Sequence, residues 1–178
     1  MIVMRHARPL REDICYGRSE VDVEPVASAL HRVIGALADQ PIERIVSSPA
    51  LRCLELARAI AQQLRRPLAC DERLRELDFG AWEGRQWSDI EVRDGARYQA
   101  WVHDWKRTAP PGGETLDRLT LRARCWLARS RPTQGWLVVT HAGVIRALRV
   151  LIDGCSWESA LAQPVRYLET VRMAVAPA

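Results

Sequence analysis

Two stretches decide the fold: Ile2-Val3-Met4-Arg5-His6 near the start of the chain and Leu137-Val138-Val139-Thr140-His141-Ala142-Gly143 much later. Each is a short apolar run that ends in a histidine. Short apolar runs of this kind are typical of buried strands, and the second run is followed by helical spacing from Val144 to Ile152. Such strands occur in mainly parallel sheets that are covered on both faces.

Outward from these stretches, the pattern of apolar residues alternates between strand and helix periods. Ser48 is expected to cap a helix with Pro49 in its first turn, and Pro25 opens another. The predicted helices are 25–37, 48–64, 115–130 and 144–152, and the predicted strands are 2–4, 44–47, 68–70 and 136–140, with one or two edge strands in 166–175. This alternation predicts a three-layer α/β/α sandwich with a mainly parallel central sheet.

The domain organisation follows from the length of 178 residues, which suits one core. We expect a single domain over residues 1–178. Residues 71–113 are less regular and rich in tryptophan, so short helices and a lid-like insertion are predicted there.

The composition is that of an ordinary globular protein, with 48% hydrophobic and 27% charged residues. The net charge of +4 is spread along the chain rather than clustered, so a small anionic substrate fits this balance as well as a polymer does. The five cysteines form no C-x-x-C pair and no leader segment is evident, so we expect a reducing cytoplasm. No apolar run reaches the roughly 20 residues of a membrane span.

The two histidines mark a candidate site, because ligands of open α/β sheets bind beyond the carboxyl ends of the strands. His6 and His141 both follow predicted strands directly. A lone histidine at either place would more often cap a strand or helix. The pair favours chemistry instead.

Arg52 and Glu76 complete the candidate constellation. Arg52 lies in the first turn of a predicted helix, where the helix dipole disfavours a cation unless an anion binds there. A surface arginine paired with Glu55 is the alternative. Glu76 has apolar neighbours that would desolvate its carboxyl group, as an acid catalyst requires, while Asp78 and Glu83 compete for this role.

These residues resemble the histidine phosphatase (phosphoglycerate mutase-like) superfamily in four ordered motifs spanning Arg5 to Ile152. The matching stretches are Arg5-His6-Ala7, Ser48-Pro49-Ala50-Leu51-Arg52-Cys53, Glu76-Leu77-Asp78-Phe79-Gly80-Ala81-Trp82-Glu83-Gly84 and Thr140-His141-Ala142-Gly143. Ala7 and Ala142 stand where the superfamily usually has glycine. A methyl group is awkward there if the backbone needs a positive φ or a close approach of phosphate.

The resemblance implies metal-independent phosphomonoester hydrolysis through a phosphohistidine on His6. Glu76 would protonate the leaving group, and no metal or other cofactor is expected. Arg5, Arg52 and His141 would stabilise the transferred phosphoryl group, and the substrate-binding set would comprise Arg5, Tyr16, Gly17, Arg18, Arg52, His141 and Ala142.

Within the superfamily, the sequence looks most like the α-ribazole phosphatase branch, which serves cobalamin assembly. The features are Cys15-Tyr16-Gly17-Arg18-Ser19, Trp101-x-x-Asp104-Trp105 and Pro110-Pro111-Gly112-Gly113-Glu114-Thr115. They imply a small phosphorylated metabolite such as α-ribazole 5′-phosphate as partner, with neither nucleic acid nor membrane, and a homodimer is left open.

Three alternatives remain. A phosphoglycerate mutase would share the constellation, although the long insertions of those enzymes are not expected in a chain this short. A phosphohistidine-protein phosphatase would share the histidines and arginines, yet the shortest of these lack the loop that carries Glu76. A non-catalytic phosphate-binding protein is the third alternative, motivated by Ala7 and Ala142.

Overall fold

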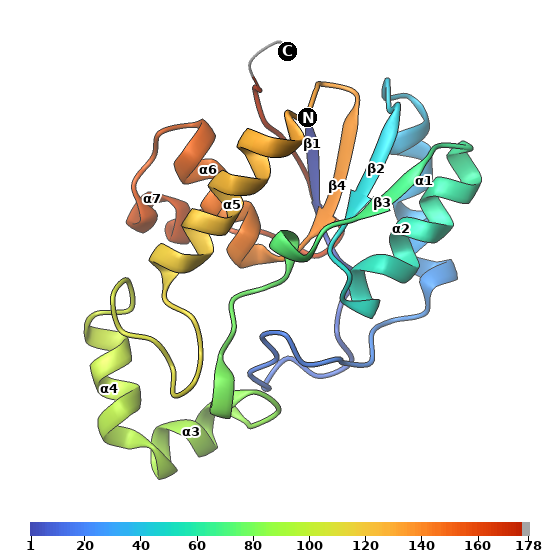
Figure 1. The fold of residues 1–178 in the computed structure, drawn as a ribbon. Helices are drawn as coiled ribbons and strands as arrows, with labels where there is room; N and C mark the ends of the chain where they lie inside the picture. Colours follow the sequence, from blue (N-terminus) through green and yellow to red (C-terminus); the bar gives the residue numbers. More distant parts are fainter. Residues whose placement is uncertain (176–178) are drawn as a thin grey trace.

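A five-stranded sheet forms the centre of the molecule in the computed structural model, which describes residues 1–175 (Figure 1). The strand order is β3-β2-β4-β1-β5, and β5 runs antiparallel to β1 whereas the other pairs are parallel. The bounds are β1 Ile2–Arg5, β2 Arg44–Ser47, β3 Leu68–Cys70, β4 Trp136–Thr140 and β5 Thr170–Arg172. The predicted α/β class with a mainly parallel sheet is confirmed.

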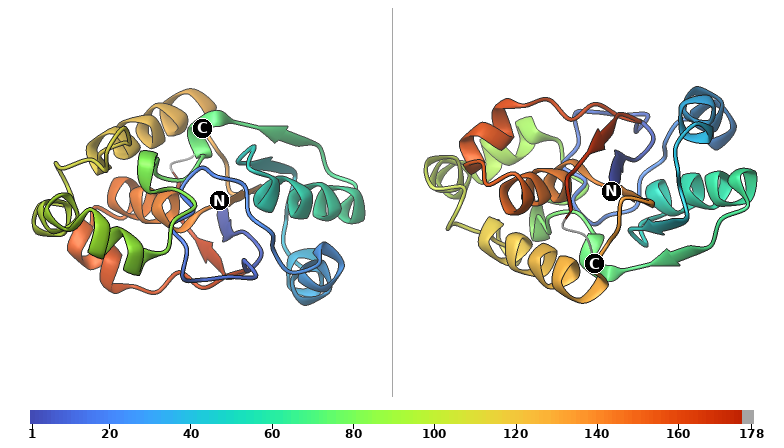
Figure 2. Two further views of the ribbon diagram at one scale, coloured as in Figure 1. Left: turned by 90° about the horizontal axis from the view of Figure 1, so that it is seen from below. Right: turned by 90° about the horizontal axis from the view of Figure 1, so that it is seen from above.

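Helices cover both faces of the sheet, as the views along its two ends show (Figure 2). Side chains alternate between the faces of a strand, so Ile2 and Met4 join the core under α1 and α2 while Val3 joins the core under α5 and α6. The bounds are α1 Val26–Ala38, α2 Leu51–Leu64, α5 Leu116–Ser130, α6 Ala142–Ile152 and α7 Trp157–Ala162. Within residues 1–175, no helix combines the length and apolarity that a membrane crossing requires.

The strand register brings the two histidines to one edge of the sheet. Arg5 of β1 pairs with Thr140 of β4, so the residues that follow, His6 and His141, leave the sheet side by side. The backbone N–H of His6 donates to the carbonyl oxygen of Thr140 at 3.0 Å. Ser48 leaves β2 at the same edge, where its N–H donates to Val139 at 2.9 Å.

Helix starts differ from the prediction at two places. Helix α2 begins at Leu51 with Ala50 as its N-cap, because the Ser48 hydroxyl lies against His141 instead of capping the helix. Helix α6 begins at Ala142, two residues earlier than predicted. Helix α7 was not predicted; it has six residues, and the Ser156 hydroxyl caps its first turn.

The predicted irregular segment folds over a small core of its own. It contains α3 (Trp87–Arg93) and α4 (Gly95–His103), which lie beyond the carboxyl ends of the strands in Figure 1. A buried cluster holds them together, and it consists of Cys15, Trp82 and Ile90 with Phe79, Trp87, Tyr98 and Trp101 packed against it. Because Cys15 belongs to the loop after β1, this cluster ties the insertion to the loop that follows His6.

Candidate active site

The imidazole rings of His6 and His141 lie together at the carboxyl edge of the sheet. Their centroids are 5.1 Å apart and the rings meet edge to face at 62°. Both are buried, with 5% of His6 and 0% of His141 exposed. The pair that the sequence placed at two strand ends is therefore brought together by the parallel pairing of β1 with β4.

His6 is held as a neutral imidazole with one nitrogen free. Its Nδ1 lies 2.7 Å from the carbonyl oxygen of Ala7, and since a carbonyl only accepts, Nδ1 carries the proton. Burial, followed by the charges of Arg52 and Arg5, lowers the pKa of His6 to about 3. Nε2 therefore keeps its lone pair at ordinary pH, as a nucleophile requires.

Arg5 and Arg52 lie beside this ring without carboxylate partners among the ion pairs of residues 1–175. Arg5 donates to the carbonyl oxygen of Val165 at 2.6 Å, while its buried Nε has no hydrogen-bond partner among the described residues. Arg52 is 3% exposed and donates to the carbonyl oxygens of Gly17 at 2.5 Å and Ser19 at 2.7 Å. Two guanidinium groups are thus fixed by neutral carbonyls, and their positive charge is left for an anion.

The start of α2 is occupied by the side chain of Glu20, a contact that the sequence did not predict. The Glu20 carboxylate accepts from the backbone N–H of Leu51 at 3.0 Å, so a side chain supplies the anion expected at this helix terminus. Arg52 is not paired with Glu55 in the structure, because its guanidinium turns back toward the loop after β1.

His141 lies beneath the site in a fully buried setting. Its Nε2 is 2.8 Å from the Ser48 hydroxyl and 3.5 Å from the Cys53 sulfur. Burial lowers the pKa of His141 well below its ordinary value and raises that of the Cys53 thiol, so both groups are uncharged. Ser48 was missed as a site residue, because the sequence suggested a helix cap for the same hydroxyl.

Glu76 is positioned by the start of α6. One carboxylate oxygen accepts from the backbone N–H of Gly143 at 3.2 Å and the other from that of Leu77 at 2.9 Å. A Cβ at position 143 would lie 2.3 Å from Glu76 Oε1, so only glycine leaves room for this carboxylate. Each oxygen keeps a second lone pair, which leaves a place for a transferable proton.

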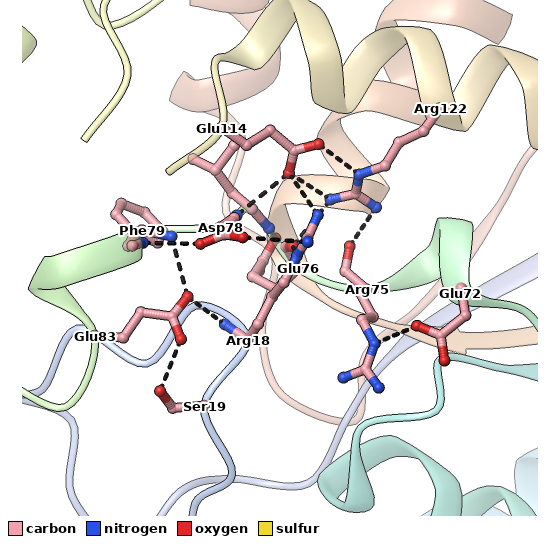
Figure 3. Close-up of polar contacts among 12 residues, drawn as sticks. Arg18, Ser19, Glu72, Arg75, Glu76, Asp78, Phe79, Glu83, Glu114 and Arg122 are labelled. Atoms are coloured by element: carbon pink, nitrogen blue, oxygen red, sulfur yellow. Dashed lines mark hydrogen bonds and ion pairs between the residues drawn. The ribbon is translucent and has the colours of Figure 1, made fainter. Parts of the chain in front are cut away.

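The competing carboxylates have structural partners instead. Asp78 pairs with Arg18 at 3.2 Å, and Glu83 accepts from the Ser19 hydroxyl at 2.7 Å and the backbone N–H of Arg18 at 2.8 Å (Figure 3). Glu114 extends the same network, since it contacts Arg18 at 3.2 Å and Arg122 at 2.7 Å. Of the three candidates for the acid, Glu76 alone lines the cavity described next.

A cavity of about 210 Å³ opens above His6. Six of the predicted site residues line it, namely Arg5, His6, Tyr16, Gly17, Arg52 and Glu76. Arg18, His141 and Ala142 are absent from its lining. The Arg18 guanidinium lies within the network of Asp78 and Glu114, and its nitrogen Nε donates to the Glu76 carbonyl oxygen at 3.3 Å. A substrate contact for Arg18 stays a prediction.

The two alanines in glycine positions are accommodated without backbone strain. Neither Ala7 nor Ala142 is among the non-glycine residues with positive φ in the described part of the chain. Ala142 is the first residue of α6, and Ala7 is 1% exposed in the core under α1 and α2. The positive φ that would have made these methyl groups costly is therefore not required.

Tyr167 is a site residue that sequence reasoning missed. Its ring lies under the Arg5 guanidinium, 3.6 Å from centroid to carbon, and 5.6 Å from the His6 ring. It also lines the cavity. Tyr167 lies at the start of the predicted edge-strand segment 166–175 and far from the motifs in sequence, and the pairing of β5 with β1 brings it to the site.

Comparisons with known proteins identify the family of the chain. The model of the histidine phosphatase superfamily (branch 1) matches residues 1–176. A putative phosphoserine phosphatase 2 of Hydrogenobacter thermophilus is 28% identical over 165 residues, which cover 89% of this chain and 81% of the relative. A bifunctional protein of Mycobacterium tuberculosis is 33% identical over 88% of this chain, which spans 45% of that longer protein.

Solved structures share the fold. The alpha-ribazole phosphatase from Shigella flexneri superposes with a TM-score of 0.83 at 24% sequence identity, covering 95% of this chain and 87% of that one. A Bacillus stearothermophilus protein gives the same TM-score of 0.83 at 22% identity and covers 98% of this chain and 94% of that chain.

Proposed function

Because this chain belongs to the histidine phosphatase superfamily, we propose that it hydrolyses a small phosphomonoester through a phosphohistidine on His6. The observation that carries the proposal is the state of His6, a neutral ring whose Nδ1 is fixed by a backbone carbonyl and whose surroundings are cationic. The predicted enzyme class, a phosphoric monoester hydrolase, agrees with relatives named phosphatases.

In the first step, Nε2 of His6 attacks phosphorus, a P–N bond forms and the P–O bond to the leaving group breaks. Arg5 and Arg52 face the charge that spreads over the phosphoryl oxygens, which is where fixed cations lower a barrier most. Glu76 gives its proton to the departing oxygen. We propose that His141, which lies beneath the lining of the cavity above His6, is a neutral ring that Ser48 orients and that contacts the phosphoryl group once the phosphoryl group is bound.

In the second step, water attacks phosphorus on the face that the leaving group has vacated. Glu76 now accepts the proton of that water, the P–N bond breaks, and inorganic phosphate leaves with His6 restored. Each proton that Glu76 gives is thus regained within one cycle. Charge stabilisation rests on side chains, so the proposed reaction needs no metal.

The substrate that we favour is α-ribazole 5′-phosphate, with cobalamin assembly in the cytoplasm as the setting. The support is the loop 15–19, which resembles that branch and places Tyr16 and Gly17 at the cavity. Phosphoserine and phosphoglycerate are the competing substrates, since relatives carry the names phosphoserine phosphatase and phosphoglycerate mutase. We also propose a homodimer, which analytical ultracentrifugation would test.

A substrate panel in the presence of a chelator tests this function. We expect release of phosphate from α-ribazole 5′-phosphate at the highest kcat/KM, inhibition by vanadate, and no turnover by His6→Ala. Activity that chelation abolishes and Mg²⁺ restores would contradict the mechanism. Transfer of the phosphoryl group to a second position of phosphoglycerate, faster than its release, would favour a mutase, and tight vanadate binding without any turnover would favour a phosphate-binding protein.

A further inference from the structure

A second cavity of about 250 Å³ adjoins the first and has a different character. Its walls come from the insertion, from α6 and from α7. The lining is mostly apolar and aromatic, and it consists of Glu76, Leu77, Phe79, Trp101, Trp105, Leu116, Ala142, Gly143, Arg146, Trp157 and Leu161. We call it the tryptophan cavity. Nothing in the mechanism above uses it.

The two cavities meet at Glu76 and Phe79, which line both. If Glu76 protonates the departing oxygen, that oxygen lies beside the Glu76 carboxyl group when the P–O bond breaks. The phosphoryl group then occupies the polar cavity at His6, and the rest of the substrate extends past Glu76. Each cavity alone is smaller than the roughly 300–1,000 Å³ of ligand pockets, whereas the two together reach that range.

The walls of the tryptophan cavity suit a flat ring. Two of the lining residues are Trp105, which follows the end of α4, and Trp157, the first residue of α7. Their ring centroids are 6.5 Å apart and the angle between the ring planes is 73°. Trp101 and Phe79 form a second edge-to-face pair at 6.0 Å. Aromatic rings in these arrangements gain energy beyond the burial of their area, so an aromatic ligand gains more here than an aliphatic ligand of equal size.

One cation stands in this apolar wall. Arg146 lies one turn along α6 from Ala142 and Gly143, on the face that lines the cavity. Its buried Nε has no hydrogen-bond partner among residues 1–175, and none of the ion pairs found there involves it. Burial lowers the pKa of Arg146, which reflects the desolvation of its charge. A desolvated donor of this kind is satisfied by an acceptor on a ligand.

We propose, on the basis of the proposed function, that the tryptophan cavity binds the leaving group. The preferred substrates are phosphate esters of alcohols that carry a flat aromatic ring with a hydrogen-bond acceptor at its edge. The ring lies among Trp101, Trp105 and Trp157, and Arg146 donates to the acceptor. A ring nitrogen or a carboxylate supplies the same chemistry, and the carboxylate receives the stronger, charge-assisted bond.

Three synthetic esters with alkyl leaving oxygens separate the parts of this proposal: propyl phosphate, benzyl phosphate and 4-carboxybenzyl phosphate. Because all three leaving groups are primary alkyl oxygens of similar basicity, each places a similar demand on Glu76 for a proton. We expect kcat/KM to rise about tenfold from propyl phosphate to benzyl phosphate, because the ring gains aromatic contacts. It should rise again by about tenfold or more from benzyl phosphate to 4-carboxybenzyl phosphate, because the carboxylate accepts a charge-assisted hydrogen bond. A benzimidazole-bearing ester is the fourth probe, for an uncharged acceptor.

Matched variants assign the effects to residues. Arg146→Met should remove most of the gain from the carboxylate while the gain from the ring is kept, and Arg146→Lys should restore part of the former. Trp157→Ala should reduce the gain from the ring. Arg129→Met on the exposed face of α5 and Trp136→Ala on β4 are the controls, and we expect both to keep the wild-type ratios.

A binding measurement keeps this inference separate from the proposed function. The ligand is 4-hydroxymethylbenzoate, the alcohol released from 4-carboxybenzyl phosphate. Calorimetry should detect its binding to His6→Ala, and its Kd should rise about tenfold or more in the double variant His6→Ala/Arg146→Met. Binding without turnover by the wild-type protein would refute the function and keep the cavity assignment. Turnover through His6 with ratios that neither Arg146→Met nor Trp157→Ala changes would overturn the cavity assignment and leave the function standing.

Discussion

The neutral state of His6 makes the stability of the protein depend on pH in a way that one substitution reveals. Burial lowers the pKa of the folded imidazole from 6.5 to about 3. The unfolded chain therefore binds a proton between these values that the folded protein does not bind. The stabilisation is present above pH 6.5 and is lost as the pH falls toward 3, by roughly 1.4 kcal/mol for each pH unit once the unfolded imidazole is protonated.

Between pH 6.5 and 4.5, this loss amounts to roughly 2 kcal/mol. In His6→Asn the titrating group is absent, so the free energy of unfolding should fall by about 2 kcal/mol less over that interval than in the wild-type protein. Urea unfolding at each pH measures both values. Protonation of the carboxylates contributes to both proteins alike and cancels in the difference. Equal losses in the two proteins would refute the claim that His6 is held neutral by burial.

Three further substitutions test the site. Arg52→Ala should lower kcat/KM by several orders of magnitude. It should also lower the free energy of unfolding by about 1–3 kcal/mol, because the carbonyl oxygens of Gly17 and Ser19 lose their donor. Urea unfolding that matches the wild-type protein would contradict the predicted loss of stability. Glu76→Gln should slow alkyl phosphates far more than p-nitrophenyl phosphate, whose leaving group needs little protonation, and an equal loss for both would remove Glu76 as the acid. Gly143→Ala should displace the Glu76 carboxylate, so alkyl phosphates should again be slowed more than p-nitrophenyl phosphate, although Glu76 is still present. Unchanged kinetics would show that the Glu76 carboxylate has room to move.

The sequence predicted what depends on local pattern and on the order of strands. Apolar runs located β1 and β4, and the rule that ligands bind beyond the carboxyl ends of parallel strands predicted that His6 and His141 form one site, which the structure confirms for their positions. The resemblance of the motifs identified Arg5, Arg52 and Glu76, which line the cavity. Local spacing is sufficient for Arg5 and Arg52, because they lie at the end of β1 and in the first turn of α2. Glu76 lies in an irregular loop between Leu74 and Gly80, so only the resemblance of its motif could assign it.

What could not be predicted are contacts that join segments distant in sequence. Tyr167 reaches Arg5 only because β5 returns along β1, and Arg146 joins the tryptophans only because α6 packs beside α7 and the insertion. The ion pairs of Arg18 with Asp78 and Glu114 could not be predicted either, because the partners of a guanidinium depend on which carboxylates the fold brings near it. The pattern of a loop sequence does not contain that information.

The central claim is that the phosphoryl group passes through Nε2 of His6, and trapping the adduct tests it most directly. Rapid quench of the wild-type protein with labelled substrate, followed by digestion, should yield an acid-labile, base-stable phosphoryl group on the peptide that carries His6. His6→Ala should yield none, and His141→Ala should form the adduct on the same peptide more slowly. A phosphoryl group mapped to the peptide of His141, or turnover without any adduct at every quench time, would contradict the account.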